Sequence, residues 1–313
     1  MVKIDIISGF LGAGKTTFAN KLLKYYLDSG LRAVFVVNEF GKTALDADIT
    51  RANGFTAVEI TNGCVCCTLK ADVPDAINEV VARFHPDRIV FEPSGIFIFD
   101  DFVEMIKTSS IKEHCELDAV MTVVDGVNFS LSKASYGNFV YNQIRNAPML
   151  VISKLDKPGV NAETIICDLR LINPEAAIIA KRWDEFGPAD FEKILATKPY
   201  DGTVQYAHGH AALDSFTFVP PEEMTRAKAG EFAALCAGGG FGNLARAKGI
   251  VTVDGRPSLI NIAQSDIEIV DFNGKQPPTF TFIGSKVDRE KILNFFFGEP
   301  VQVKRGFFHR KSG

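Results

Sequence analysis

The sequence lacks any apolar run long enough to cross a membrane as a helix, and it carries little net charge. Its 313 residues hold 34 Lys and Arg against 38 Asp and Glu, which is a formal net charge of -4. Such a chain has no electrostatic reason to bind nucleic acid as its main partner. The N-terminus also lacks a signal-peptide layout. We therefore expect a cytoplasmic protein with neither a membrane nor a nucleic acid as partner.

Cysteines are few, and half of the 6 are clustered. Cys64, Cys66 and Cys67 lie together, whereas the other three stand apart at Cys115, Cys167 and Cys236. In a reducing compartment all are expected to be thiols, which argues against a disulfide framework. Repeats and low-complexity segments are absent as well. The 46% hydrophobic and 23% charged residues are typical of a globular protein, and the length allows two cores.

The stretch around which the chain is organised is Gly9-Phe10-Leu11-Gly12-Ala13-Gly14-Lys15-Thr16. It follows an apolar run at 2–7 and precedes a helical pattern at 17–28, which is the context of a phosphate-binding loop. Glycines let backbone N–H groups surround phosphate oxygens, and the following helix N-terminus adds unpaired donors. Lys15 is predicted to reach the β- and γ-phosphates, and the Thr16 hydroxyl to bind Mg²⁺. The predicted nucleotide-binding residues here are Gly9, Gly12, Ala13, Gly14, Lys15, Thr16 and Thr17.

Apolar strands alternate with helical stretches over residues 1–185. Strands are predicted at 31–37, 58–60, 88–91, 119–124, 149–152 and 176–180, with a helix at 70–84. Polar motifs follow several of these strands, which is typical of a mostly parallel sheet covered by helices on both faces. Residues 1–185 are thus predicted to form an α/β P-loop NTPase domain.

The pattern changes after residue 185. Residues 186–214 carry several turn signals and are interpreted as a helix-containing linker. From 215 to 313 strands dominate, at 215–219, 250–253, 259–263, 267–271 and 279–283, with helices near 221–236 and 288–297. Strand runs with segregated helices predict a smaller C-terminal α+β domain.

Glu92 ends a buried strand, where nucleotide hydrolases hold an acid near Mg²⁺ or its waters. Gly95 follows shortly after and is predicted to present its backbone N–H to the γ-phosphate, so that this segment senses that phosphate. The alternative is an ordinary carboxylate at a strand end. Lys15, Thr16 and Glu92 form the predicted catalytic set, and the sequence identifies no base for the attacking water.

Ser153-Lys154-Leu155-Asp156 follows another strand and bears on which nucleobase, guanine or adenine, the site binds. A carboxylate at Asp156 can accept from the N1–H and the exocyclic amine of guanine, a paired contact that adenine cannot offer. GTPases usually have Asn or Thr at the first position, where Ser153 keeps a hydroxyl but lacks the amide. We predict guanine binding through Ser153, Lys154 and Asp156, against the alternative of a plain strand-to-loop turn.

The segment Cys64-Val65-Cys66-Cys67 predicts a metal site, because thiolates favour Zn²⁺ and other soft or borderline ions. No second cysteine pair completes a closed site, which suits loading and release of an ion. Glu39, at the end of another strand, is the expected oxygen ligand. Packing cysteines and a thiol redox centre stay open as alternatives. His208 and His210 are interpreted as part of a solvated linker rather than as ligands.

These motifs together resemble the CobW family of metal-binding P-loop GTPases, which is related to the nickel chaperones HypB and UreG. The resemblance rests on the phosphate loop followed in order by three further motifs: Asn38-Glu39-Phe40-Gly41, Gly63-Cys64-Val65-Cys66-Cys67 and Glu92-Pro93-Ser94-Gly95. Residues 244–249 also resemble the Arg-x-Lys-Gly segment of the CobW C-terminal domain. The resemblance implies slow GTP hydrolysis coupled to binding and transfer of zinc or cobalt, with Mg²⁺ at Thr16 and a metal site at the cysteine loop.

Three features depart from the family pattern. Ser153 replaces Asn or Thr, residues 95–99 replace Gly-Leu-Ala-Asp/Glu-Pro, and the histidine-rich tract is reduced to His208 and His210. We expect a GTP-hydrolysing metallochaperone that delivers Zn²⁺ or Co²⁺ to a client metalloprotein under the control of GTP and GDP, and a homodimer stays open. The alternatives are an NTPase or a maturation adaptor whose zinc is fixed or sensory and which delivers no metal.

Overall fold

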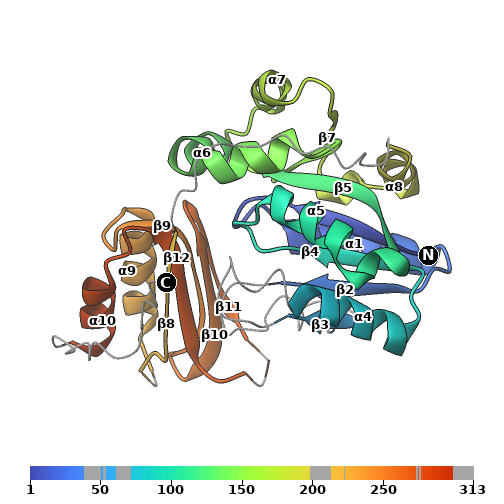
Figure 1. The fold of residues 1–313 in the computed structure, drawn as a ribbon. Coiled ribbons are helices and arrows are strands. Elements are labelled where there is room, and N and C mark those ends of the chain that lie inside the picture. Colours follow the sequence, from blue (N-terminus) through green and yellow to red (C-terminus); the bar gives the residue numbers. More distant parts are fainter. Residues whose placement is uncertain are drawn as a thin grey trace, which may run out of the picture. The chain divides into compact units, whose positions relative to one another are not determined.

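The structure is a computed structural model that describes residues 1–38, 51, 54–60, 72–197, 213–221, 223–272, 274 and 276–298. The chain divides into two compact units, which are described separately (Figure 1). The first consists of Met1–Ala212 with the short segments Gln264–Asp266 and Gly274–Gln276. The second consists of Leu213–Ala263, Ile267–Asn273 and Pro277–Gly313.

A parallel seven-stranded sheet forms the middle of the first unit, in the order β3-β2-β4-β1-β5-β6-β7. Its strands are apolar and buried because helices cover both faces. This confirms the predicted α/β fold, and each predicted strand overlaps an observed one. The strands are β1 (Val2–Ser8), β2 (Ala33–Val37), β3 (Ala57–Glu59), β4 (Arg88–Glu92), β5 (Cys115–Asp125), β6 (Met149–Ser153) and β7 (Ala177–Ala180).

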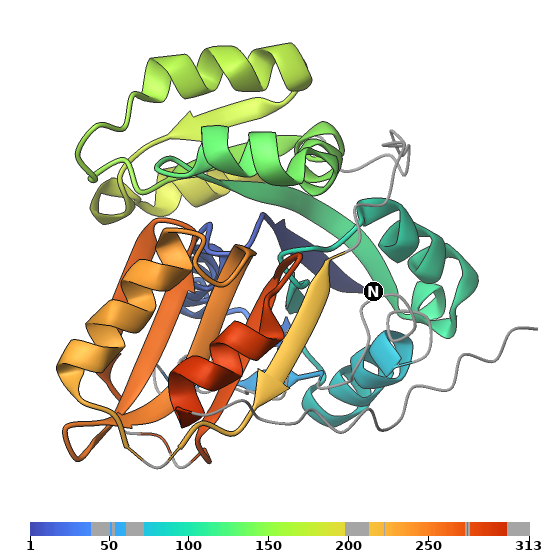
Figure 2. The same ribbon diagram turned by 90° about the vertical axis from the view of Figure 1, so that its left-hand side faces the viewer.

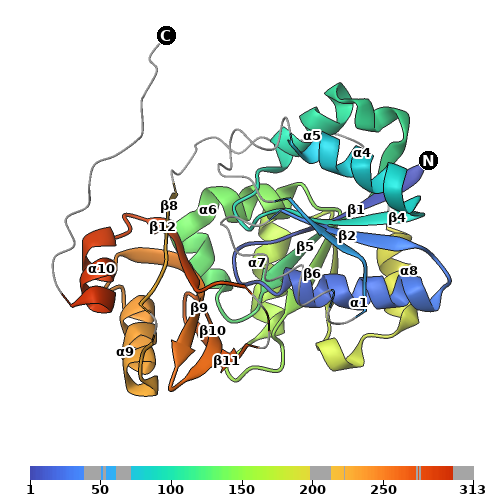
Figure 3. The same ribbon diagram turned by 90° about the horizontal axis from the view of Figure 1, so that it is seen from below.

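Helices α1 (Lys15–Asp28) and α8 (Pro188–Leu195) lie on one face of this sheet, and α4 (Asp72–Phe84) and α5 (Phe99–Thr108) lie on the other (Figure 3). Helix α6 (Phe129–Arg145) packs against β5 and α7 (Ala162–Ile172). Two short 3₁₀ turns are η1 (Ser110–Glu113) and η2 (Trp183–Glu185). Helix α1 ends at Ser29, and Gly30 follows with a φ of 77°, a left-handed conformation that glycine adopts freely.

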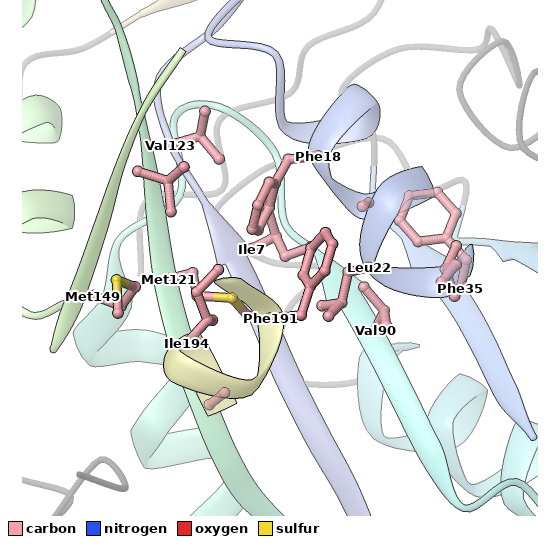
Figure 4. Packing of buried hydrophobic residues seen from close by; sticks show 14 of the residues in the cluster. Ile7, Phe18, Leu22, Phe35, Val90, Met121, Val123, Met149, Phe191 and Ile194 are labelled. Carbon is pink, nitrogen blue, oxygen red and sulfur yellow. The ribbon is translucent and has the colours of Figure 1, made fainter. Parts of the chain in front are cut away.

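Helix α8 lies within the stretch 186–214 that the sequence analysis interpreted as a helix-containing linker. Its Phe191 and Ile194 are 5% and 1% exposed, and they pack against α1 in the core of the first unit. The structure therefore adds α8 to this unit, because its apolar face is needed to cover the sheet. Residues 198–212 lie outside the described residues. Figure 4 shows this core, with labelled side chains at Ile7, Phe18, Leu22, Phe35, Val90, Met121, Val123, Met149, Phe191 and Ile194.

A five-stranded sheet forms the second unit, in the order β11-β10-β9-β12-β8. The pairings of β9 with β10, β9 with β12 and β8 with β12 are antiparallel. Helices α9 (Arg226–Ala237) and α10 (Arg289–Phe297) lie side by side on one face (Figure 2), over an aromatic core that includes Phe232, Phe280, Phe282 and Phe296. The strands are β8 (Asp214–Phe218), β9 (Asn243–Val253), β10 (Arg256–Ala263), β11 (Asp266–Asp271) and β12 (Thr279–Ser285).

The second unit confirms the predicted small α+β fold. Strand β9 begins seven residues earlier than the predicted strand at 250–253, so residues 244–249 lie within it. In the described part of the chain, no helix combines the length and the apolar character needed to span a membrane.

Candidate nucleotide-binding site

The predicted nucleotide motifs follow three strands, β4, β1 and β6, which lie within the sheet order β4-β1-β5-β6. Because these strands are parallel, their carboxyl ends meet at one edge of the sheet. The glycine-rich loop follows β1, Glu92 ends β4, and Ser153 ends β6. The structure thus brings together the motifs that the sequence analysis placed at strand ends.

The glycine-rich loop at residues 9–14 requires glycine for conformation and for space. Gly9, Gly12 and Gly14 have φ values of 146°, 78° and 92°. A Cβ atom on Gly9 would lie only 2.4 Å from the carbonyl oxygen of Val123 in β5. Helix α1 begins directly after Gly14, and its first turn contains no acidic residue. A helix start of this kind favours an anion such as a phosphate.

Lys15, Thr16 and Glu92 lie together at the start of α1 and the end of β4. The Thr16 hydroxyl donates to Glu92, with Oγ1 at 2.9 Å from Oε2 and 3.2 Å from Oε1. Lys15 Nζ lies 3.9 Å from Glu92 Oε1, and each of these two side chains is only 6% exposed. A hydroxyl and a carboxylate are oxygen donors of the kind that Mg²⁺ prefers. Thr16 and Glu92 therefore fit a Mg²⁺ ion, which Glu92 can bind directly or through water.

Gly95 packs directly against the phosphate loop. A Cβ atom at Gly95 would lie 2.6 Å from the backbone nitrogen of Leu11, so no other residue fits without movement of the loop. Its carbonyl oxygen accepts a hydrogen bond of 3.1 Å from Gln143 Nε2 in α6. The residues after Gly95 depart from the family pattern, and Phe97 and Phe99 there are each 1% exposed. The substituted segment is thus anchored by apolar packing beside the loop.

Ser153 connects the base-recognition motif to the phosphate loop. Its hydroxyl is 1% exposed and lies 2.7 Å from the carbonyl oxygen of Ala13, to which it donates. The carbonyl oxygen of Val124 lies 3.1 Å from the same Oγ atom. The side chain therefore contacts the backbone of the loop, where the sequence analysis placed it among the residues that bind the base.

Lys154 has a φ of 58°, and its ammonium group is held between two carboxylates. Nζ lies 2.9 Å from Asp125 Oδ2 and 2.7 Å from Oδ2 of Asp266, a residue that begins β11 and groups with the first unit. Burial alone would lower the pKa of Lys154, but Asp125 and Asp266 outweigh it and raise that pKa. The side chain of Asp156 is 49% exposed, so its carboxylate is accessible to a ligand.

Asp125 is a residue of this site that the sequence analysis did not identify. It ends β5, is 6% exposed, and accepts hydrogen bonds from the backbone N–H groups of Val127 (2.9 Å) and Asn128 (3.1 Å) as well as from Lys154. An acid directly after a buried strand was the signal that could have found it, as for Glu92. Tyr136 of α6 stacks on Phe10 of the loop with ring centroids 5.0 Å apart, and no local signal marks it.

Two backbone hydrogen bonds connect Glu92 to the segments that precede the predicted metal ligands. The N–H of Asn38 donates to the carbonyl oxygen of Glu92 at 2.9 Å, and the N–H of Ile60 donates to that of Val37 at 2.9 Å. Asn38 directly precedes Glu39, and Ile60 precedes the stretch that holds the cysteine loop. Asn38 is therefore bonded to the end of β4 that carries Glu92, and Ile60 is bonded to the end of β2, the strand next to β4.

The predicted transition-metal ligands Glu39, Cys64, Cys66 and Cys67 lie outside the described residues, as do His208 and His210. Within the described ranges, no group of three or more His, Cys, Asp or Glu side chains is placed to hold a metal ion. Of the remaining cysteines, Cys115 and Cys236 are buried and Cys167 is exposed. Burial raises the pKa of the Cys115 thiol to about 11 and also raises that of Cys236, which disfavours both as thiolate ligands.

A family model described as CobW/HypB/UreG, nucleotide-binding domain, matches residues 3–180. The chain is 38% identical over 135 residues to the zinc chaperone CobW of Pseudomonas aeruginosa. This alignment covers 39% of this chain and 35% of that protein. It is 35% identical over 131 residues to a zinc chaperone CobW of a Sinorhizobium species, with 36% of that protein covered. The chain thus spans about a third of the length of these curated relatives.

A longer alignment exists with the zinc chaperone YjiA of Escherichia coli, which is 23% identical over 323 aligned positions and covers 95% of this chain and 98% of that protein. The crystal structure of zinc-bound YjiA GTPase from the same organism aligns over 95% of this chain and 98% of that chain, with 21% identity and a TM-score of 0.44. The family model spans more than half of the chain, including every residue predicted here to bind the nucleotide. This protein therefore belongs to the CobW/HypB/UreG family of P-loop GTPases.

Proposed function

We propose that this protein is a Mg²⁺-dependent GTPase that binds Zn²⁺ or Co²⁺ and passes the ion to a client metalloprotein under nucleotide control. The observation that carries the nucleotide part is the meeting of Lys15, Thr16 and Glu92 at an uncapped helix start. The metal part is supported by the thiolate cluster in the sequence and by relatives named zinc chaperones.

Hydrolysis depends on charge stabilisation by groups that are already in place. Mg²⁺ at Thr16 and Glu92 would neutralise part of the negative charge on the phosphate oxygens. The N–H groups of the loop and the ammonium of Lys15 stabilise the charge that develops on the transferred phosphoryl group. Lys15 is only 6% exposed, so its charge acts in a site with little water and is weakly screened.

Guanine is the base that fits the described motif. The exposed carboxylate of Asp156 accepts from the N1–H and the exocyclic amine of guanine, whereas adenine offers no such pair of donors. The Ser153 hydroxyl binds the Ala13 carbonyl oxygen of the phosphate loop. This hydrogen bond holds the start of the base-recognition motif next to the phosphate loop.

Nucleotide control of the metal site follows from the connections at the end of β4. Loss of the γ-phosphate changes the contacts of Glu92 and Gly95, and the Glu92 carbonyl is hydrogen-bonded to Asn38. A shift at this point would reach Asn38 directly and Ile60 through Val37, and these are the described residues that precede Glu39 and the cysteine stretch in the sequence. We assign the metal to Cys64, Cys66, Cys67 and Glu39, as a cargo ion whose release follows the loss of the γ-phosphate.

Metal titration in two nucleotide states tests this proposal. We expect Zn²⁺ and Co²⁺ to bind at least about tenfold more tightly with Mg²⁺ and a non-hydrolysable GTP analogue than with Mg²⁺-GDP, a typical allosteric coupling. The change Cys66→Ser/Cys67→Ser should abolish tight binding, and Cys167→Ser, at an exposed cysteine outside the cluster, should not. Equal affinities in both states would exclude the coupling. Metal that resists prolonged chelation in both states would favour a fixed zinc site instead.

A further inference from the structure

A buried ionic network lies in the first unit, on the strands that lead to the nucleotide site. Asp5 is in the middle of β1 and is 0% exposed. Arg88 of β4 places NH1 at 2.9 Å from Asp5 Oδ1 and 3.0 Å from Oδ2. Tyr26 of α1 donates its hydroxyl to Asp5 Oδ2 at 2.7 Å. The Asp5 carboxylate of β1 thus binds one side chain from β4 and one from α1.

Further contacts hold the arginine of this network in one orientation. The Arg88 guanidinium lies over the Tyr26 ring, 4.9 Å from its centroid. NH1 also lies 2.9 Å from Asp118 Oδ2 of β5, and Lys3 Nζ lies 3.3 Å from Asp118 Oδ1. The register of β5 against β1 shifts between the partners of Ile4 and Ile6, which is where Asp118 lies. Both partners of Asp5 are thus held by further contacts: Arg88 by Asp118, and Tyr26 by the Arg88 guanidinium over its ring.

Stability alone does not account for a charge at this position. Ile7, two positions along β1 on the same face as Asp5, and Tyr26 are each 0% exposed, so an apolar side chain would fit the surroundings. Burial raises the pKa of Asp5 to about 6 even though Arg88 and Tyr26 lower it. Replacing a buried ion pair by packed apolar residues is often neutral or stabilising. What the network does supply is a fixed relationship between the elements that it joins.

We propose that Asp5, Tyr26 and Arg88 are positioning residues that set the geometry of the Mg²⁺-nucleotide site, and this inference rests on the GTPase function proposed above. Strand β1 continues into the phosphate loop, α1 begins with Lys15 and Thr16, and β4 ends in Glu92. Side-chain hydrogen bonds of the network join these three elements, whose ribbons are labelled in Figure 3.

The network acts at a distance from the nucleotide. Tyr26 is eleven residues along α1 from Lys15, which at a rise of about 1.5 Å per residue is about 16 Å. Tyr26 therefore anchors the far end of the helix whose first turn holds Lys15 and Thr16. A tilt or slip of α1 relative to β4 would separate Thr16 from Glu92, and a misplacement of about 1 Å can cost about a hundredfold in rate.

The test replaces the ion pair without leaving a buried charge alone. In Asp5→Leu/Arg88→Met, both partners become apolar, and Asp118 keeps Lys3. In Tyr26→Phe, the ring is retained and only the hydroxyl is lost. The matched control is Lys133→Met/Asp168→Leu, an ion pair between α6 and α7 that joins none of the three elements. The measurements are the melting temperature, GDP affinity in EDTA, kcat for GTP hydrolysis and the Mg²⁺ concentration at half-maximal rate, all without Zn²⁺ or Co²⁺.

We expect the double variant to keep or raise its melting temperature, to need about tenfold more Mg²⁺ and to lose at least about tenfold in kcat, while the control matches the wild type. Tyr26→Phe should shift the Mg²⁺ requirement in the same direction by a smaller factor. A folded double variant with the wild-type Mg²⁺ requirement and kcat would overturn the proposal. Should that variant not fold, a folded Tyr26→Phe variant with an unchanged Mg²⁺ requirement would overturn it instead.

Failure of the GTPase proposal itself has a different signature. A wild-type protein that neither hydrolyses GTP nor responds to Mg²⁺ would contradict the proposed function. The GDP affinity in EDTA would then still report on the phosphate loop. A drop of about tenfold in that affinity in the folded double variant supports the positioning role, and an unchanged affinity in this case counts against it.

Discussion

The Thr16 hydroxyl lies 2.9 Å from Oε2 of Glu92, although the two residues are 76 positions apart in the chain. The pair joins the start of α1, which directly follows the phosphate loop, to the end of β4. Both residues offer oxygen atoms to a hard cation, and one of them brings the negative charge that such an ion needs. The relationship makes Glu92 the first residue to test.

The change Glu92→Gln should lower kcat for GTP hydrolysis by about a hundredfold or more and raise the Mg²⁺ requirement, because the amide brings no charge to the ion. The variant should also melt lower without nucleotide, since Lys15, which is 6% exposed, loses a nearby carboxylate. Bound phosphates should restore much of that loss. Steady-state hydrolysis against Mg²⁺ concentration and thermal melting with and without nucleotide measure both effects.

The exposed Glu79 of α4 provides the matched control for this change. Glu79→Gln should leave hydrolysis and the Mg²⁺ requirement unchanged. Wild-type hydrolysis in Glu92→Gln would remove Glu92 from the catalytic set.

The change Ser153→Ala should destabilise the phosphate loop, because the buried carbonyl of Ala13 loses a donor at 2.7 Å. Removing one partner of a buried hydrogen bond costs about 1–3 kcal/mol in the free energy of unfolding. We expect GTP and GDP to lose affinity by the same factor, since the lost bond lies behind the loop. Nucleotide titration of both ligands and urea unfolding check this. Ser258→Ala, at a buried hydroxyl of the second unit, is the control, and a selective loss of GTP alone would contradict the assigned role.

The change Asp156→Asn should alter base preference. A carboxylate accepts from the N1–H and the amine of guanine, whereas an amide can donate to the carbonyl that xanthine has in place of that amine. A buried site built for a paired contact discriminates by about 10⁴- to 10⁵-fold, and a smaller factor is expected at the half-exposed Asp156, so GTP affinity should fall while XTP affinity rises. Competition binding of the two nucleotides measures the switch. Asp184→Asn, 66% exposed before the change, should keep the wild-type preference for GTP.

The sequence predicted the parts of this site that depend on local order. Glycine spacing, an apolar strand before the loop and a helix after it describe the phosphate loop without any distant contact. Acidic and polar residues at strand ends were placed at one sheet edge by the parallel topology, which is why Glu92 and Thr16 meet as expected. Asp125 obeys the same rule, and only its neighbours show what it binds.

The parts that the sequence did not predict depend on contacts between distant residues. Ser153 carries a hydroxyl suited to many roles, and its partner Ala13 is 140 positions away. A helix was predicted somewhere within residues 186–214, but its packing against α1 through Phe191 depends on a contact with a distant part of the chain. A single Asp5 within an apolar strand carries no periodic signal, and its partner Arg88 lies 83 positions away.

The pH dependence of stability provides a test of the charge state of Asp5. Burial raises the pKa of this carboxyl from 3.8 to about 6 in the folded protein. The folded state therefore holds the proton more tightly than the unfolded chain, and the stability contributed by this proton is present below pH 3.8 and is lost as the pH rises through about 6. Asp5→Asn cannot titrate, so it should lack this part of the pH dependence.

Between about pH 4 and pH 7, the wild type should lose up to about 3 kcal/mol in its free energy of unfolding relative to Asp5→Asn. The other charged or titratable groups that face Asp5, which are Lys3, Tyr26, Arg88 and Asp118, are present in both proteins, so their own contributions largely cancel in the difference. Urea unfolding at several pH values measures it, with Asp28→Asn at an exposed carboxylate as control. Parallel stability curves for wild type and Asp5→Asn would show that Asp5 titrates equally in both states and that its burial does not hold the proton.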